Sequence, residues 1–113
     1  GSRRRRRRCG SSRCACGGIS GGRRIAELAD HYGLPVALHN CGSLVHNMAN
    51  IHFGASVRNF SMSETRLYAH DFIAEMGGLD GFDVVDGKIA VPEVPGLGCD
   101  VDPEKLQRYR VEC

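Results

Sequence analysis

Residues 33–40 read Gly-Leu-Pro-Val-Ala-Leu-His-Asn, and this stretch decides the fold of the 113-residue chain. Gly33 fits the left-handed position that ends a helix, and Pro35 prevents the helix from continuing. Residues 35–38 are all apolar, as expected of a short strand with both faces buried in a parallel sheet. In barrels of alternating strands and helices, the carboxyl ends of the strands carry the catalytic groups. His39, which follows this strand directly, is therefore the first candidate functional residue.

A helix is predicted on each side of this strand. The first covers residues 22–32 after an N-cap at Ser20. Its inward face is predicted to consist of Ile25, Leu28, Ala29 and Tyr32. The second covers residues 44–56 after an N-cap at Ser43. Its inward stripe is predicted to consist of Leu44, Met48, Ile51 and Ala55. A second buried strand over residues 59–63 and a third helix over residues 68–76 follow, and this alternation predicts an α/β fold.

The pattern changes after Gly78. Residues 82–85 and 88–91 are predicted to pair as a small hairpin around the turn Asp86-Gly87. Prolines and glycines make residues 92–98 an extended tail. Pro103 suits the first position of a final helical turn over residues 103–109.

Charge divides the chain into two parts. Residues 1–16 contain seven arginines and no acid, whereas residues 17–113 contain eight basic and 13 acidic side chains. The run Arg3–Arg8 could bind nucleic acid through phosphates, but no aromatic side chain interleaves it. Residues 1–16 are therefore expected to be a solvated, disordered tail or sequence foreign to the domain. Residues 17–113 are expected to form the folded domain. No apolar stretch is long enough to cross a membrane, so no membrane partner and a cytoplasmic location are expected.

Cysteine spacing argues against a structural metal site. The six cysteines are Cys9, Cys14, Cys16, Cys41, Cys99 and Cys113. The first three follow a C-x4-C-x-C spacing, which lacks the paired C-x2-C units of a zinc site. Because two others fall in segments typical of a packed cytosolic α/β unit, six reduced thiols are expected rather than a disulfide framework.

Five short motifs follow one another along the chain. They are Gly17-Gly18-Ile19-Ser20, Arg24-Ile25-Ala26, Gly33-Leu34-Pro35 followed by His39, Asn59-Phe60 ending in Glu64, and residues 86–98. In this order and spacing the chain resembles the C-terminal part of the enolase superfamily, in the branch of mandelate racemase, muconate lactonizing enzyme and the sugar-acid dehydratases. The resemblance runs from residue 17 to about residue 111.

The resemblance implies an incomplete C-terminal segment of a (β/α)8 barrel: about two strand–helix units, one further helix and an extended tail. The parent enzymes carry a capping domain and abstract the proton beside a carboxylate, with magnesium stabilising the enediolate. His39 matches the histidine after the seventh strand, which acts as a base or an acid. Glu64 matches the carboxylate after the eighth strand, which donates a hydrogen bond or proton to the substrate carboxylate. Asn40 is expected to line the pocket.

The chain also departs from this family. The acidic magnesium ligands on strands three to five, and the lysine used on strand two, have no counterpart, so no metal ligand is expected in this chain. The aspartate that orients the histidine falls at Ser12 by spacing.

Three interpretations stay open at this point. In the first, the chain is a fragment of a racemase or dehydratase for a sugar acid or 2-hydroxy acid, and it is inactive alone. Alternatively, a separate chain supplies the missing barrel half and capping domain, or the chain associates with itself. The third is a non-enzymatic polybasic module that binds nucleic acid on a degenerate half-barrel.

Overall fold

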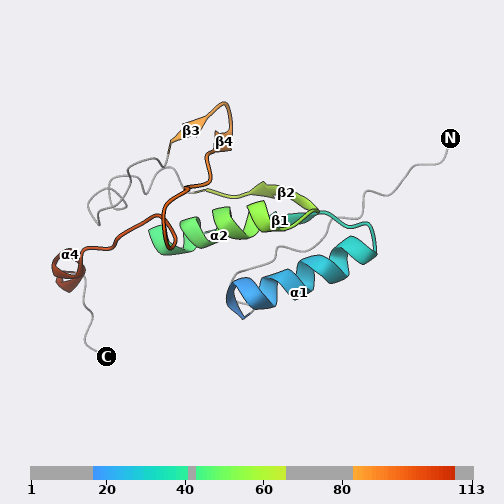
Figure 1. The fold of residues 1–113 in the computed structure, drawn as a ribbon, viewed down its shortest axis with the longest axis horizontal. Helices are drawn as coiled ribbons and strands as arrows, with labels where there is room; N and C mark the ends of the chain where they lie inside the picture. The colour runs from blue at the N-terminus through green and yellow to red at the C-terminus, as the bar shows by residue number, and fades with distance from the viewer. Residues whose placement is uncertain (1–16, 41–42, 66–82, 109–113) are drawn as a thin grey trace.

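The computed structural model describes residues 17–40, 43–65 and 83–108 (Figure 1). In chain order these residues form α1 (Gly18–His31), β1 (Val36–Leu38), α2 (Leu44–Ser56), β2 (Phe60–Ser63), β3 (Val84–Val85), β4 (Lys88–Ile89) and α4 (Pro103–Gln107). The predicted α/β class is confirmed. The expectations for the basic tail, for the helix over residues 68–76 and for every cysteine except Cys99 lie outside the described residues.

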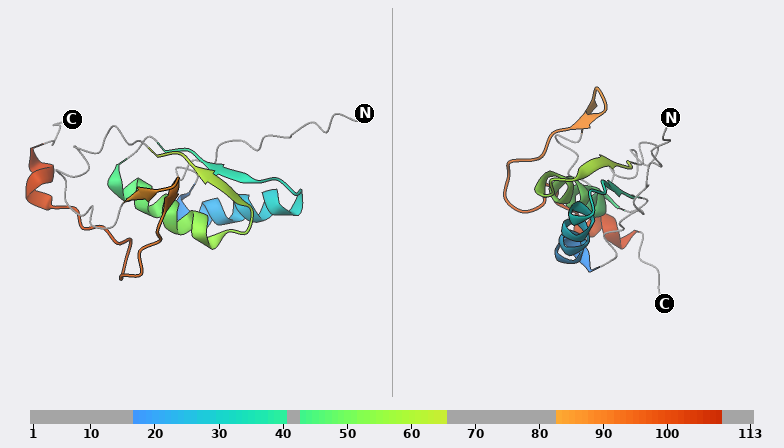
Figure 2. Two further views of the ribbon diagram at one scale, coloured as in Figure 1. Left: turned by 90° about the horizontal axis from the view of Figure 1, so that it is seen from above. Right: turned by 90° about the vertical axis from the view of Figure 1, so that its right-hand side faces the viewer.

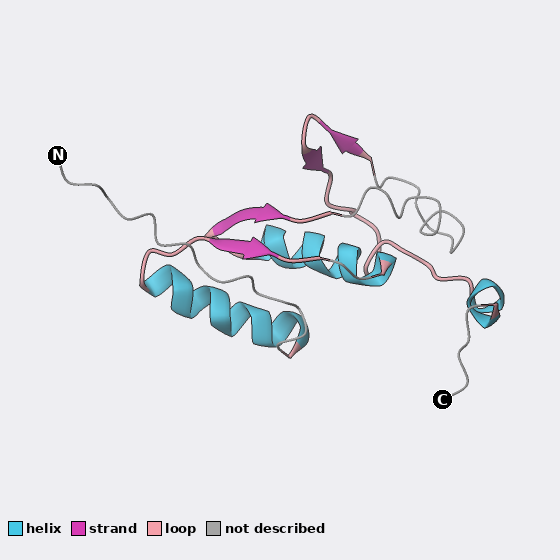
Figure 3. Ribbon diagram, turned by 180° about the vertical axis from the view of Figure 1, so that it is seen from behind, coloured by secondary structure: helices cyan, strands magenta, loops and turns pink. Residues whose placement is uncertain are grey.

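The centre of the fold is a parallel pair of strands, β1 and β2, joined through α2 (Figure 3). Each strand begins one residue later than predicted. Val36 and Leu38 lie on the same face of β1 and form one buried cluster with Ala26 and Ala29 of α1 and Phe53 of α2. Both helices therefore pack on one face of the strands, as the end-on view in Figure 2 shows. Helices on a single face of parallel strands are typical of a barrel wall.

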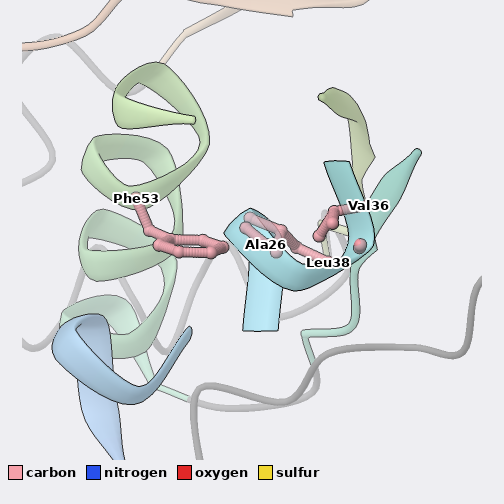
Figure 4. Close-up of a cluster of buried hydrophobic side chains, with 5 residues drawn as sticks. Ala26, Val36, Leu38 and Phe53 are labelled. Carbon is pink, nitrogen blue, oxygen red and sulfur yellow. The ribbon is translucent and has the colours of Figure 1, made fainter. Parts of the chain in front are cut away.

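The first helix buries a different face from the predicted one. Its buried residues are Gly22, Ala26 and Ala29, whereas Leu28 is 62% exposed and Tyr32 is 71% exposed. The reason is close packing, because a Cβ added at Gly22 would lie only 3.0 Å from the ring of Phe53. Small residues let the backbone of α1 approach that ring (Figure 4), and the larger apolar residues are left on the outer face. Of the predicted inward face, only Ala29 is buried.

The helix boundaries follow from capping. The predicted N-cap at Ser20 is wrong, because the helix begins earlier and Gly17, with φ 94°, is the N-cap. The predicted end at Gly33 is confirmed by its φ of 64°. There the amide of Gly33 donates to Asp30 O at 2.8 Å and that of Leu34 to Ala29 O at 2.9 Å, the two bonds of a Schellman motif.

The second helix has the predicted bounds. The hydroxyl of Ser43 accepts a hydrogen bond from the His46 amide at 3.4 Å, as an N-cap should. Leu44 and Met48 are buried against the hairpin and tail, through Ile89 and other residues of 89–99. Ala55, predicted to face inward, is exposed.

Strand β2 is not buried as predicted. Phe60 is 41% exposed and Met62 is 63% exposed. Among the described residues β2 pairs with β1 alone, so its other edge has no neighbouring strand in this part of the chain. The sequence pattern of residues 59–63 fits a strand with neighbours on both edges. Among the described residues, β2 has a neighbouring strand on one edge only.

The hairpin is confirmed. Strands β3 and β4 pair antiparallel, and the turn residues Asp86 and Gly87 both have positive φ, at 50° and 71°. That combination defines the tight turn that matches the twist of the strands. Pro103 occupies the first turn of α4, which Asp102 caps. Within the described ranges, no helix is long and apolar enough to cross a membrane.

Candidate active site

Two candidate residues meet at the carboxyl ends of β1 and β2. His39 follows β1 and Glu64 follows β2, and the His39 Nδ1 atom lies 2.6 Å from Glu64 Oε2. The backbone brings them together, since the Glu64 amide donates to Leu38 O at 2.8 Å. Of the predicted site residues, these two form a direct side-chain contact.

A register shift produces this contact. Val36 pairs with Phe60, but Ala37 pairs with Met62 and Leu38 with Ser63, so β2 carries one extra residue. Without that residue, Leu38 would face Met62, and the position after it would face Ser63. An extra residue in one strand re-aims the side chains beyond it. Here it sets the glutamate beside the histidine.

The third predicted residue, Asn40, is 1% exposed. Its backbone amide donates to Glu64 Oε2 at 3.2 Å. Asn40 therefore contributes to the site through its main chain, by holding the carboxylate that also contacts His39. Both contacts use the same carboxylate oxygen.

Asn50 of α2 belongs to the same network, although the sequence reasoning did not single it out. It is 1% exposed and its Nδ2 donates to His39 O at 3.3 Å. The helix thus fixes the backbone that carries the imidazole. The sequence offered little signal for this role, because α2 also carries the polar residues His46, Asn47 and His52.

An imidazole beside a carboxylate is suited to proton transfer. The side chain of His39 is 31% exposed and that of Glu64 is 54% exposed, so a small molecule can reach both. The Asn40 amide and the Asn50 side chain hold these two groups in place. The arrangement can accept or donate a proton at the end of the strands.

The described residues do not fit a magnesium site. Among them, no three side chains of His, Cys, Asp or Glu lie close enough together to hold a metal ion. The acidic group at the strand ends, Glu64, pairs with His39 instead.

A cavity of about 610 Å³ lies between α2, β2 and the hairpin. Its lining includes Asn50, Ser63 and Thr65, which adjoin the site, together with apolar residues and Lys88. His39, Asn40 and Glu64 do not line it. The cavity therefore flanks the candidate site and shares Asn50 with it.

Two further histidines and one cysteine among the described residues have other surroundings. The ring of His52, whose Nε2 lies 3.1 Å from Leu97 O, connects α2 to the tail. His31 is exposed at the end of α1. Cys99 is a free thiol. Burial, followed by the charge of Asp100, raises the pKa of Cys99.

Comparison with known proteins gives consistent results. Residues 10–105 match the family model described as enolase C-terminal domain-like. The chain is 33% identical over 96 residues to the D-xylonate dehydratase of Haloferax volcanii, covering 85% of this chain and 23% of that enzyme. It is 34% identical over 95 residues to the D-mannonate dehydratase of a Sphingomonas species, covering 82% of this chain and 23% of that enzyme.

A solved structure shares the arrangement. It is a mandelate racemase/muconate lactonizing enzyme-like protein from Rubrobacter xylanophilus, with a TM-score of 0.73 and 35% identity, matched over 86% of this chain and 25% of that one. The chain thus spans about a quarter of the length of the relatives it matches.

Proposed function

Because this chain belongs to the enolase C-terminal domain-like family, we propose that it carries the proton-transferring end of an active site for sugar acids. The relatives include enzymes named as dehydratases of D-xylonate and D-mannonate. The reaction class is removal of the hydrogen beside a carboxylate. The contact between His39 Nδ1 and Glu64 Oε2 at 2.6 Å carries this proposal.

In this proposal His39 moves the proton. A hydrogen beside a carboxylate is weakly acidic, so its removal needs a positioned base whose proton affinity suits neutral pH, and imidazole is such a base. Once protonated, the ring is a cation, and the adjacent Glu64 carboxylate stabilises it. Asn40 and Asn50 hold these two groups in place.

We further propose that the site is completed outside this segment. The remaining strands of a (β/α)8 barrel, a capping domain and the acidic ligands of a magnesium ion would come from another part of the protein or another chain. The coverage of about a quarter of each relative supports this view. On this view the 113-residue chain alone does not turn over a sugar acid.

The test replaces the matching segment of the Sphingomonas D-mannonate dehydratase with residues 17–108 of this chain. The hybrid is expected to dehydrate D-mannonate in the presence of magnesium, and His39→Asn is expected to reduce its kcat by about 10²–10⁴-fold. His31→Asn, at the exposed end of α1, is the matched control and should leave kcat unchanged. An active hybrid that is insensitive to His39→Asn would contradict the assignment. Turnover of D-mannonate or D-xylonate by the chain alone would contradict the proposed incompleteness.

A further inference from the structure

We infer that Glu64 is a positioning residue that fixes the tautomer of His39, so that Nδ1 carries the hydrogen and Nε2 is the atom that receives a proton. The consequence for catalysis rests on the proposed function. The tautomer itself does not, because it follows from contacts within this chain.

Donor and acceptor chemistry sets the tautomer of the His39 ring. A neutral imidazole carries one N–H, and an ionised carboxylate can only accept hydrogen bonds. At 2.6 Å from Glu64 Oε2, Nδ1 of His39 is within hydrogen-bond distance and must supply the hydrogen. A hydrogen bond made by one ring nitrogen decides which nitrogen is protonated. Nε2 is then the nitrogen that lacks a hydrogen and can act as a base.

Glu64 is itself held in place. Its Oε2 accepts from the Asn40 amide at 3.2 Å, and its own amide donates to Leu38 O at 2.8 Å. The carboxylate is thereby tied to the same strand end that carries the histidine. A charged acceptor makes a stronger hydrogen bond than a neutral one, and the bond from the Asn40 amide helps to fix its orientation.

The histidine backbone is restrained from the other side. Asn50, buried in α2, donates to His39 O at 3.3 Å. The ring therefore has a fixed point of attachment as well as a fixed partner. Positioning of this kind removes the need to orient the base when a substrate arrives.

This role differs from the one that the sequence suggested for Glu64. A glutamate directed at a substrate carboxylate would leave His39 to be oriented by another group. Here both contacts use Oε2, and the side chain of Glu64 remains 54% exposed. The two roles can coexist on one side chain.

The contact could instead be a surface ion pair without consequence, since exposed pairs contribute little to stability. The tautomer distinguishes the two cases. A stability measurement would not, because a weak pair and a positioning pair can cost the same when broken.

The test is ¹⁵N solid-state NMR of the full chain with labelled histidine. This method works whether or not the chain self-associates. It is recorded at a pH of about 9, where histidines of ordinary pKa are neutral. Signals that disappear in His39→Gln identify the residue. Native His39 is expected to show Nδ1 as the protonated nitrogen. Glu64→Ala is expected to move the ring toward the Nε2–H form. Glu27→Ala, which removes an exposed carboxylate from α1, should change nothing.

Glu64→Gln provides a second variant of the same size. Its amide oxygen can still accept from Nδ1, but as a weaker, uncharged acceptor, so the Nδ1–H proton resonance should move upfield. A native ring protonated at Nε2 overturns the inference. So does a ring that keeps Nδ1–H unchanged in Glu64→Ala, or an Nδ1–H resonance that does not move in Glu64→Gln. No substrate is involved, so these results stand apart from the fate of the hybrid dehydratase.

Discussion

Gly22→Ala is expected to destabilise the chain, although the same change usually stabilises a helix. In an exposed helix, alanine is favoured over glycine by about 0.5–1 kcal/mol. Here the added Cβ would lie 3.0 Å from Cε2 and 3.2 Å from Cζ of Phe53. That ring is 1% exposed and packs with Ala26 and β1 (Figure 4), so it has little room to move. Overpacking of this kind costs about 1–3 kcal/mol, which leaves a net loss of roughly 1 kcal/mol.

A second substitution, Phe53→Leu, tests whether the contact with the Phe53 ring causes this loss. Leucine lacks the Cε2 and Cζ atoms and keeps carbons at the Cδ position, where the distance to the added Cβ is an ordinary 3.6 Å. Phe53→Leu alone should cost on the order of 1–2 kcal/mol through the space it leaves. In that background Gly22→Ala should reverse sign and stabilise by up to about 1 kcal/mol.

The assay is urea unfolding at low protein concentration, followed by circular dichroism. With a urea dependence of about 1–3 kcal/mol/M, a change of 1 kcal/mol moves the midpoint by roughly 0.3–1 M. The double variant gives the coupling directly. Additive effects of the two substitutions would refute the reasoning, as would a raised midpoint for Gly22→Ala alone.

Further outcomes are expected elsewhere in the molecule. Asn59→Asp should lower the free energy of unfolding by about 1–3 kcal/mol near neutral pH, as measured by urea unfolding. A carboxylate would replace an amide that donates to two backbone carbonyls at 3.0 and 2.9 Å. In acid the loss should be smaller, because the protonated carboxyl group can donate again. Ser43→Ala should cost about 1 kcal/mol in the same assay, with Ser43→Asp near neutral. Because the pKa of Cys99 is raised, its alkylation near pH 8, followed by peptide mass spectrometry, should be slower than that of an exposed thiol of ordinary pKa. Asp100→Asn should accelerate it. Met62→Lys should reduce self-association in sedimentation, since Met62 is 63% exposed on β2; unchanged association would place the contact elsewhere.

Local signals predicted several helix and turn boundaries, although not the start of α1. Ser43 and Gly33 mark their helix boundaries because the caps depend on backbone geometry within a few residues. The turn at Asp86 and Gly87 was predictable for the same reason. In contrast, the buried face of α1 depends on how closely the helix approaches Phe53. Hydrophobicity predicted that the large residues would be buried. The helix instead lies so close to the Phe53 ring that Gly22 and its small neighbours are buried.

The sequence predicted His39 and Glu64 as candidates but not their contact, and it did not single out Asn50. A strand followed by a histidine, and a second strand followed by a glutamate, identified His39 and Glu64. Their meeting depends on one extra residue in β2, and sequence periodicity does not reveal a register shift of one residue. The donation from Asn50 to His39 O needs the helix and the strand placed together, which no local pattern encodes.

The hydrogen bond from the Glu64 amide to Leu38 O, at 2.8 Å, lies at the open end of the two strands. Such ends fray, each with its own local opening equilibrium. The fraction of molecules with histidine and glutamate face to face can be no larger than the fraction in which this bond is closed. An opening free energy of about 2.8 kcal/mol would leave roughly one molecule in a hundred parted, whereas about 1.4 kcal/mol would leave one in ten. Substitutions that strengthen the strand end can therefore raise the population of the assembled site without touching either side chain.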